Sequence, residues 1–161
     1  MIKTKISHIK FSKKPIPLPA EYRATYKISQ IVLILKLSCS GNKASLLKLH
    51  LLSWALKSDV NRRKLLDFIR SNFKEDFKTW GIEPALNRAL SYAIAEELCK
   101  IEKGNYLLTE KGNLFYSKII NSSEVLNIEI DFLKQLGKRK ITDNKILALS
   151  KKWEKSNDEN K

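Results

Sequence analysis

The chain has 161 residues, of which 43% are hydrophobic, and its 31 Lys and Arg against 17 Asp and Glu give a net charge of +14 at pH 7. This length indicates one domain, or one domain with extensions, with enough apolar residues for a core. The longest apolar run, 31–35, is far shorter than the about 20 residues that span a bilayer, and no apolar segment of a signal peptide follows the basic N-terminus. We therefore expect a cytoplasmic protein with no membrane partner.

The positive charge is concentrated near both ends of the chain. Residues 1–30 carry seven Lys and Arg against one acidic residue, and residues 133–152 carry the same ratio. Such a distribution favours an anionic partner: nucleic acid, such as double-stranded DNA, an acidic protein surface or anionic lipid. A composition rich in Lys, Ile and Asn also arises from AT-rich coding sequence, which is the competing explanation. The candidate phosphate contacts in these two regions are Lys13, Lys14, Lys138, Arg139 and Lys140.

The first twenty residues have the character of an arm. Basic residues precede Pro15-Ile-Pro-Leu-Pro19, which favours an extended, stiff spacer, so residues 1–20 are predicted to form a basic arm and a Pro-rich spacer. Residues 22–37 then predict a helix whose C-terminal half is apolar on nearly every side and central in the core. A strand over 28–37 is the alternative, because β-branched residues are dense there.

A Leu-rich helix is predicted over 44–57, after a turn at 38–43. Its leucines lie on almost every side, so it must either be buried on two faces or bind a partner. Leu47, Leu51 and Trp54 are the candidate partner-binding residues.

A further helix is predicted over 59–80. Ser58 or Asp59 can cap its start, and Gly81 is expected to close it. Its apolar stripe consists of Leu66, Ile69, Phe73, Phe77 and Trp80.

The segment 84–98 is predicted to be an amphipathic helix that runs into a short β-hairpin. Pro84 suits the first helical turn, and the residues Glu102-Lys103-Gly104-Asn105 suit a tight hairpin tip. The exposed face is expected to carry Asn87, Arg88, Ser91, Tyr92 and Ala95.

Thr109 is expected to cap a helix that follows the hairpin directly. Leu114, Phe115 and Ile119 would form its buried side, and Gly112 is expected where this helix passes close to another backbone. Two more helices are predicted over 123–136 and 142–153, and residues 154–161 are predicted to be a polar tail.

The strand-to-helix signal Tyr106-Leu107-Leu108-Thr109-Glu110-Lys111-Gly112 resembles the "Y-x-L-T-x-x-G" end of the wing in bacterial winged-helix regulators. The resemblance implies a mainly α fold: a winged-helix core with a short β-hairpin wing and added helices. The core would span 21–121 with the 59–80 helix inserted, and 122–153 would hold the C-terminal helices. It also implies that the helix before the wing faces DNA, with Asn87, Arg88, Ser91 and Tyr92 outward and Lys100 and Lys103 on the wing.

The predicted DNA-facing helix departs from the composition of a base-reading helix. Arg88 is its one basic residue between Pro84 and Cys99, whereas Glu96 and Glu97 are acidic. Because base readers use Arg, Lys, Gln and Asn, this composition does not favour sequence-specific reading.

A second resemblance concerns Ile31-Val-Leu-Ile-Leu35 and the stretch from Gly41 to Lys57. This pattern is similar to the small middle components of bacterial ABC-three-component defence systems, of which Lamassu-like systems are one branch. The resemblance implies a non-enzymatic subunit that bridges an SMC-like ATPase and an effector protein. It transfers no residue roles, because that family has no catalytic signature.

The sequence offers little for catalysis. Cys39 and Cys99 stand alone, so no zinc site is expected, and no phosphate-binding glycine motif is present. His50 lies on the Leu-rich helix and is interpreted as a core or interface histidine, and His8 has no neighbouring carboxylate. We expect no catalytic residue, metal, cofactor or small-molecule substrate. The leading hypothesis is therefore the bridging subunit with basic ends that contact DNA; a free-standing winged-helix regulator is the main alternative, and a small enzyme is a third class.

Overall fold

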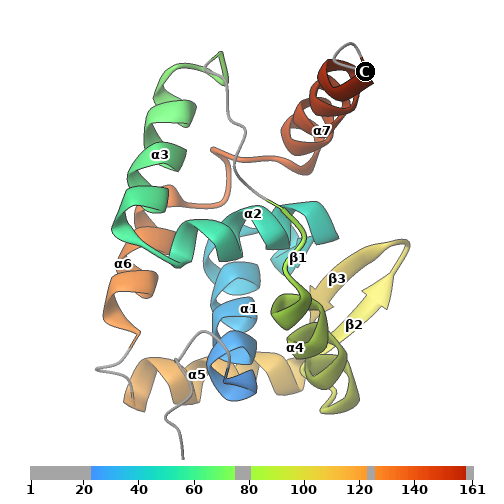
Figure 1. The fold of residues 1–161 in the computed structure, drawn as a ribbon. Coiled ribbons are helices and arrows are strands. Elements are labelled where there is room, and N and C mark those ends of the chain that lie inside the picture. Colours follow the sequence, from blue (N-terminus) through green and yellow to red (C-terminus); the bar gives the residue numbers. More distant parts are fainter. Residues whose placement is uncertain (1–22, 75–80, 123–125, 159–161) are drawn as a thin grey trace, which may run out of the picture.

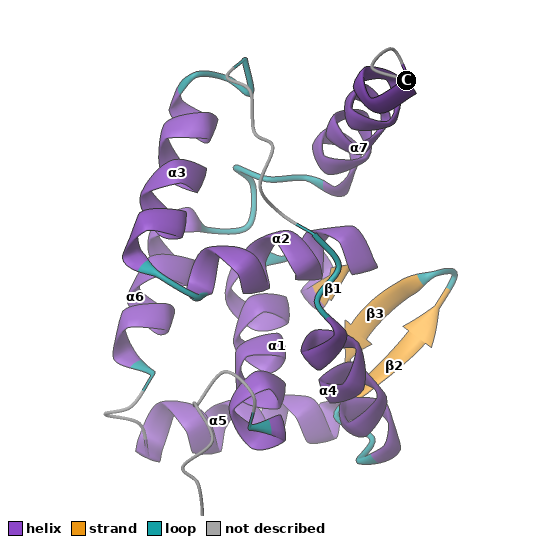
Figure 2. Ribbon diagram, viewed as in Figure 1, coloured by secondary structure: helices purple, strands orange, loops and turns teal. Residues whose placement is uncertain are grey.

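The computed structural model describes residues 23–74, 81–122 and 126–158, with side chains up to Lys152. The predicted N-terminal arm, with Lys13 and Lys14, lies outside the described residues, as do Phe77, Trp80 and the side chain of Trp153. The described part is mainly helical and contains a small three-stranded antiparallel sheet (Figures 1 and 2).

The described elements follow one another along the chain. In order they are α1 (Ala24–Ser38), η2 (Ser40–Asn42), β1 (Lys43–Ala44), α2 (Leu46–Leu56), α3 (Asp59–Arg70), α4 (Pro84–Ala95), β2 (Cys99–Glu102), β3 (Asn105–Leu108), α5 (Glu110–Ser122), α6 (Asn127–Leu136) and α7 (Asp143–Asp158). Figure 1 shows α1 in the middle of the molecule, with α2 across its C-terminal end and the β2–β3 hairpin beside α4.

Helix α1 is the centre of the core. Residues 31–35 have no exposed surface, because α4, α5 and α6 pack around the helix. The helix prediction for this segment is confirmed, and the alternative strand over 28–37 is wrong. A helix buried on all sides reads as a continuous apolar run, which periodicity alone does not distinguish from a buried strand.

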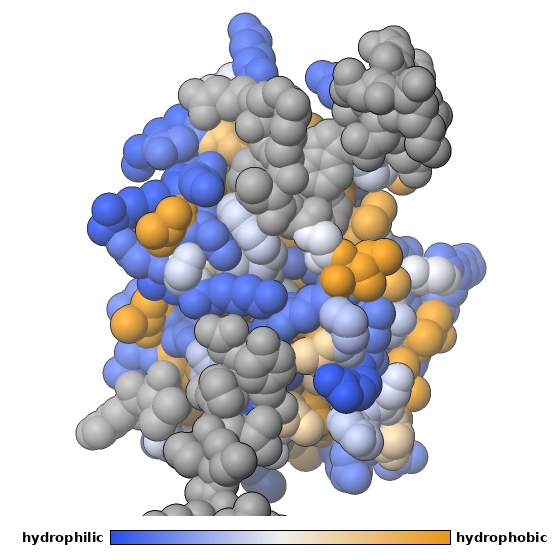
Figure 3. Space-filling view, viewed as in Figure 1, coloured by the Kyte–Doolittle hydropathy of each residue, from blue (hydrophilic) through white to orange (hydrophobic). Residues whose placement is uncertain are grey.

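Helix α2 is covered by the protein's own helices. The side-chain oxygen of Ser45 accepts the Lys48 N–H at 3.2 Å and so caps the helix. Helices α1, α3 and α7 contact α2, and every residue from Leu46 to Leu56 is buried or half-buried. In the part of Figure 3 that is not grey, hydrophobic residues form separate small patches among hydrophilic ones.

Helix α3 is shorter than predicted. Ser58 caps its start through a bond from the Asn61 N–H, but the helix ends at Arg70 rather than at Trp80, so Gly81 does not close it. Asn72 and Phe73 adopt left-handed φ angles of 57° and 63°. The Phe73 N–H donates to the Phe68 carbonyl at 3.0 Å, and the two rings meet edge to face. This local closure overrides the apolar spacing that predicted continuation.

The hairpin has the predicted tip, and a third strand joins it. Lys103 and Gly104 have positive φ angles of 51° and 77°, as in a two-residue turn of type I′. Strand β3 pairs antiparallel with both β2 and β1, which gives the order β1-β3-β2. Strand β1 was not predicted from the sequence, because two residues carry no alternating pattern.

Helix α5 begins with the predicted cap: the Gly112 N–H donates to Thr109 Oγ1 at 3.0 Å. Ile119 is buried and Phe115 packs against the core, but Leu114 is 63% exposed, so its predicted burial is wrong. Leu114 precedes Phe115 in the helix and so points away from the face that Phe115 and Ile119 share.

The two C-terminal helices differ from prediction mainly at their ends. Helix α6 begins at Asn127 instead of 123, and Leu126, Ile130, Leu133 and Leu136 are buried. Helix α7 continues through Asp158, so the segment predicted as a polar tail from residue 154 is helical for most of its length.

Gly112 offers a direct test of the packing between α5 and the hairpin. A Cβ at this position would lie 2.2 Å from the Leu98 carbonyl oxygen and 2.5 Å from Leu108 Cδ1. We expect Gly112→Ala to destabilise the fold by roughly 1–3 kcal/mol, because this overlap exceeds the gain in helix propensity of about 1 kcal/mol. Urea unfolding measures the difference.

Gly81→Ala is the matched control, because a Cβ there meets nothing within 4 Å. It should change the free energy of unfolding by less than about 0.5 kcal/mol. Equal stability of the two variants would contradict the described approach of α5 to Leu98.

Candidate functional site

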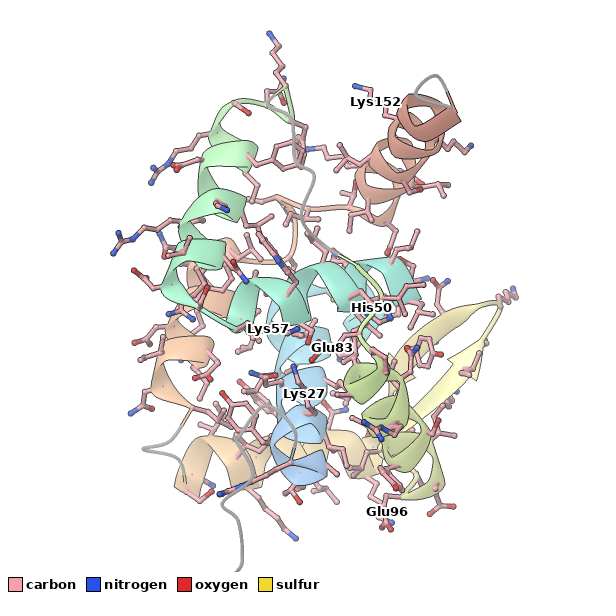
Figure 4. All side chains as sticks on the ribbon, in the orientation of Figure 1. Lys27, His50, Lys57, Glu83, Glu96 and Lys152 are labelled. Carbon is pink, nitrogen blue, oxygen red and sulfur yellow. The ribbon has the colours of Figure 1, made fainter. Side chains whose placement is uncertain are left out.

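The outward face of α4 is the first candidate surface. Asn87, Arg88, Ser91, Tyr92 and Ala95 are exposed, as predicted, and Leu86, Ala89, Leu90 and Ala93 are buried on the opposite side. Tyr92 is 55% exposed, and Ile82, just before the helix, is 72% exposed. The acidic Glu96 and Glu97 follow at the C-terminal end, where Figure 4 labels Glu96. The face is therefore mixed apolar and polar, with a single cation.

The hairpin next to α4 adds an equally mixed surface. Lys103 is exposed at the tip, and Ile101 is 55% exposed. Lys100 is also exposed, but its Nζ lies 3.5 Å from the Glu102 carboxylate, which offsets its charge. The predicted wing residues are thus placed on the hairpin.

A partly buried polar cluster holds the start of α4. We call it the Glu83 network; it consists of Lys27 on α1, His50, Ser53 and Lys57 on or just after α2, and Glu83 and Asn87 at the start of α4. Figure 4 shows four of these side chains, Lys27, His50, Lys57 and Glu83, gathered between α1, α2 and the chain leading into α4.

Glu83 is the common partner of the two lysines. Its carboxylate lies 3.1 Å from Lys27 Nζ and 3.4 Å from Lys57 Nζ, and it accepts the Ser53 hydroxyl at 3.1 Å. The side chain of Lys27 is only 1% exposed and also donates to Ser53 Oγ at 3.0 Å. Burial alone would raise the pKa of Glu83, but the charges of Lys27 and Lys57 with these hydrogen bonds prevail and lower it below its ordinary value of 4.5.

His50 links α2 to α4 through both of its ring nitrogens. Nδ1 accepts the Glu83 backbone N–H at 3.1 Å, so the ring proton sits on Nε2, which lies 3.1 Å from Asn87 Oδ1. Burial is the main cause that lowers the pKa of His50 below 6.5, outweighing the opposing effects of Asn87 and Glu83. With both nitrogens engaged, His50 has a structural role in this arrangement, in line with its interpretation as a core or interface histidine.

Sequence reasoning missed most of this network. In the sequence Lys27 is one of several cations in a basic segment, and neither Ser53 nor Glu83 belongs to a recognisable motif. A weak signal was present: Lys27 stands where an otherwise apolar helix faces the core, and Glu83 directly precedes the Pro that starts α4. A lysine at such a position requires a buried anionic partner.

The predicted partner-binding residues on α2 do not form an exposed patch. Leu51 is 1% exposed and belongs to the core, so its assignment to a partner surface is corrected. Leu47 and Trp54 are half-buried and pack against the same core. The apolar character of α2 is accounted for by its burial beneath α1, α3 and α7.

The predicted nucleic-acid contacts are placed on three separate elements. Arg88 lies on α4, Lys103 at the hairpin tip, and Lys138, Arg139 and Lys140 in the turn between α6 and α7. All five are exposed. The turn is joined to η2 by hydrogen bonds, which brings Lys43, a residue absent from the sequence prediction, next to the cluster.

The two thiols are buried and poorly ionised. Burial raises the pKa of Cys39 to about 11 and that of Cys99 to about 12. Within the described ranges no three His, Cys, Asp or Glu side chains come together as they would to hold a metal ion. The described helices also include none with the length and apolar character that crossing a membrane requires.

Comparison with known protein families, curated proteins and solved structures gives no match for this chain.

The Glu83 network predicts a specific pattern of mutational coupling. Glu83→Gln leaves Lys27 buried without its carboxylate and should destabilise the protein by about 3–5 kcal/mol in urea unfolding. The double variant Lys27→Met/Glu83→Gln should be more stable than Glu83→Gln alone, because it also removes the buried cation. Additive effects of the two single substitutions would contradict a direct pairing.

The state of His50 predicts a dependence of stability on pH. Because its folded-state pKa lies below the ordinary 6.5, the unfolded chain takes up the proton first. The stabilisation is complete above 6.5 and is lost as the pH falls from 6.5 through the lower folded-state pKa. We expect the free energy of unfolding of the native protein to fall over this interval more steeply than that of His50→Gln. His8 is present in both proteins and cancels; parallel curves would refute this assignment.

Proposed function

We propose that this protein is a non-catalytic, winged-helix subunit that binds a larger protein partner through α4 and its surroundings and contacts DNA through its basic surface. The observation that supports this proposal is the composition of the outward face of α4. On this face the exposed Tyr92 accompanies a single cation, Arg88, and Ile82 is exposed just before the helix. Protein interfaces are enriched in Tyr, Arg and exposed apolar side chains, whereas base-reading helices carry several basic and amide groups.

The order of the elements supports a winged-helix core. A helix and a short strand precede α2, and after α4 a hairpin pairs with that strand in the order β1-β3-β2. In winged-helix domains the hairpin likewise follows the third helix, and it pairs with a short strand that follows the first helix in the sequence. Helix α3 would be the inserted element, and α6 and α7 the additions.

Placement in a bacterial defence assembly rests on the resemblance of the α1 and α2 segments to ABC-three-component middle subunits. In such an assembly the partners would be an SMC-like ATPase and an effector protein. A small subunit of this kind needs no active site of its own. It needs a rigid core with separate surfaces for its partners, and the Glu83 network supports such rigidity for α4.

A free-standing DNA-binding regulator is the alternative. The exposure of Arg88 on α4 next to a hairpin that carries Lys103 favours it, because the same two elements contact DNA in winged-helix regulators. The two functions differ in whether α4 reads bases or contacts protein.

Co-expression of the tagged protein with the products of its neighbouring genes tests the proposal. Tyr92→Ala should reduce the recovery of a co-purified SMC-like or effector subunit, as expected for an aromatic interface residue worth about 2 kcal/mol. Leu114→Ala is the control, because Leu114 is also a large hydrophobic residue and is 63% exposed on a different helix. Undiminished recovery with Tyr92→Ala, or no co-purified neighbour at all, would contradict the proposal.

Arg88→Ala distinguishes the proposed subunit from the alternative, a DNA-binding regulator. In the subunit it should leave the affinity for any duplex nearly unchanged. In a base-reading regulator it should relax a defined footprint and weaken binding by roughly 1–3 kcal/mol.

A further inference from the structure

Two basic segments that are distant in sequence form one surface. Ser40 Oγ donates to the Lys138 carbonyl at 3.3 Å, and Lys138 Nζ lies 3.3 Å from Asn42 Oδ1. Lys43 follows Asn42, and Arg139 and Lys140 follow Lys138. We call Lys43, Lys138, Arg139 and Lys140 the basic turn patch; all four side chains are exposed. In Figure 1 the second segment is the orange connection between α6 and α7.

The backbone beneath this patch is fixed by buried polar contacts. Lys48, 3% exposed, donates to the Ile141 carbonyl at 2.8 Å, and Ser38 Oγ donates to the Leu133 carbonyl at 3.0 Å. On the far side of the turn, Asp143 Oδ1 accepts hydrogen bonds from the Ser45 N–H at 3.0 Å and from the Ser45 hydroxyl at 2.6 Å. A turn held on both sides loses little further backbone freedom on binding a ligand.

The charge of the patch is not neutralised by ion pairs. Among the described residues, no salt bridge involves any of its four cations, whereas Arg63 and Arg70 on α3 pair with Asp59 and Asp67. Asp143 is the acidic residue of the turn region, and its carboxylate already accepts two hydrogen bonds from Ser45. The patch therefore keeps a local excess of positive charge.

The side chains around the cations narrow the class of partner. Residues 40–43 and 137–140 contain only Ser, Gly, Asn, Lys and Arg. Without an aromatic side chain the patch has no platform for stacking single-stranded bases, and without an exposed apolar one it has nothing to insert into a bilayer. Lys, Arg, Ser and Asn are the groups that bind phosphate oxygens along a duplex.

We propose that the basic turn patch binds the sugar-phosphate backbone of double-stranded DNA without sequence preference. This inference deepens the DNA contact of the proposed function: it assigns that contact to this turn and adds Lys43 to the cluster. It places this DNA contact outside α4, and Lys43 lies on β1, which pairs with strand β3 of the hairpin.

Fluorescence anisotropy with two unrelated duplexes of equal length tests the assignment in the full-length protein. The variant Lys138→Glu/Arg139→Glu/Lys140→Glu should bind both duplexes at least tenfold more weakly at low salt. Its slope of log affinity against log salt should fall by up to about 0.9 for each phosphate that the variant no longer neutralises. Lys43→Glu alone should lower the slope by up to about 0.9, the value for one phosphate.

The control Lys64→Glu/Lys74→Glu/Lys118→Glu removes the same net charge from exposed positions outside the patch. It should retain affinity within about twofold, and circular dichroism should show that all variants remain folded. Equal weakening by the control would mean that net charge alone drives binding. Tighter binding to a single strand or to anionic phosphatidylserine vesicles, or no duplex binding at low salt, would also overturn the assignment.

The two tests fail independently. If the patch variants bind DNA as the native protein does while Tyr92→Ala still reduces co-purification, the patch assignment falls and the protein-binding function stands. If duplex binding depends on the patch but no neighbour co-purifies, the proposed subunit function falls.

Discussion

The carboxylate of Glu83 is the contact on which the placement of α4 depends. This carboxylate lies between the Nζ atoms of Lys27 and Lys57, and the backbone N–H of Glu83 donates to His50 Nδ1. A lysine that is 1% exposed is stable only with such a partner, since an uncompensated buried charge is costly. The residue that starts α4 therefore also satisfies a charge on the central helix, and α4 cannot shift without uncovering it. A buried polar network of this kind favours one register, because an apolar contact would tolerate sliding.

The positions of the hairpin and of α5 follow from the placement of α4. From α4 the chain enters β2, and the Thr109 N–H and hydroxyl both donate to the Leu98 carbonyl at 3.0 Å, which ties the end of β3 to the start of β2. Gly112 then lets α5 approach the same carbonyl more closely than any residue with a Cβ allows. Helix α4, the hairpin and the first turn of α5 are thus held as one unit. The outward face of α4 is presented by a rigid scaffold, as a docking surface requires.

Elements with a clear local pattern were predictable from the sequence, and those set by distant contacts were not. The amphipathic stripe of α4, the hairpin tip at Lys103 and Gly104, and the Thr109 cap each depend on neighbouring residues only, and all are present. Strand β1 is too short to carry a pattern, and α3 stops where Phe73 folds back onto Phe68. The Glu83 network joins Lys27 to a residue 56 positions further along the chain, so Lys27 and Glu83 looked like ordinary surface charges. Leu51 was misassigned because the coverage of α2 by α3 and α7 is a tertiary property.

The chemical difference between the two exposed surfaces bears on how the proposed subunit would serve two partners. The α4 face offers Tyr92 with a single cation, and Ile82 is exposed just before the helix; the basic turn patch offers cations without an apolar side chain. A protein partner gains from burying the first and little from the second, because lysine and arginine side chains are costly to desolvate. Phosphates gain from the second through counterion release, which needs no burial. The surfaces therefore do not compete for the same ligand. Since they lie on different elements, occupation of one leaves the chemistry of the other intact, as bridging between a protein and DNA requires.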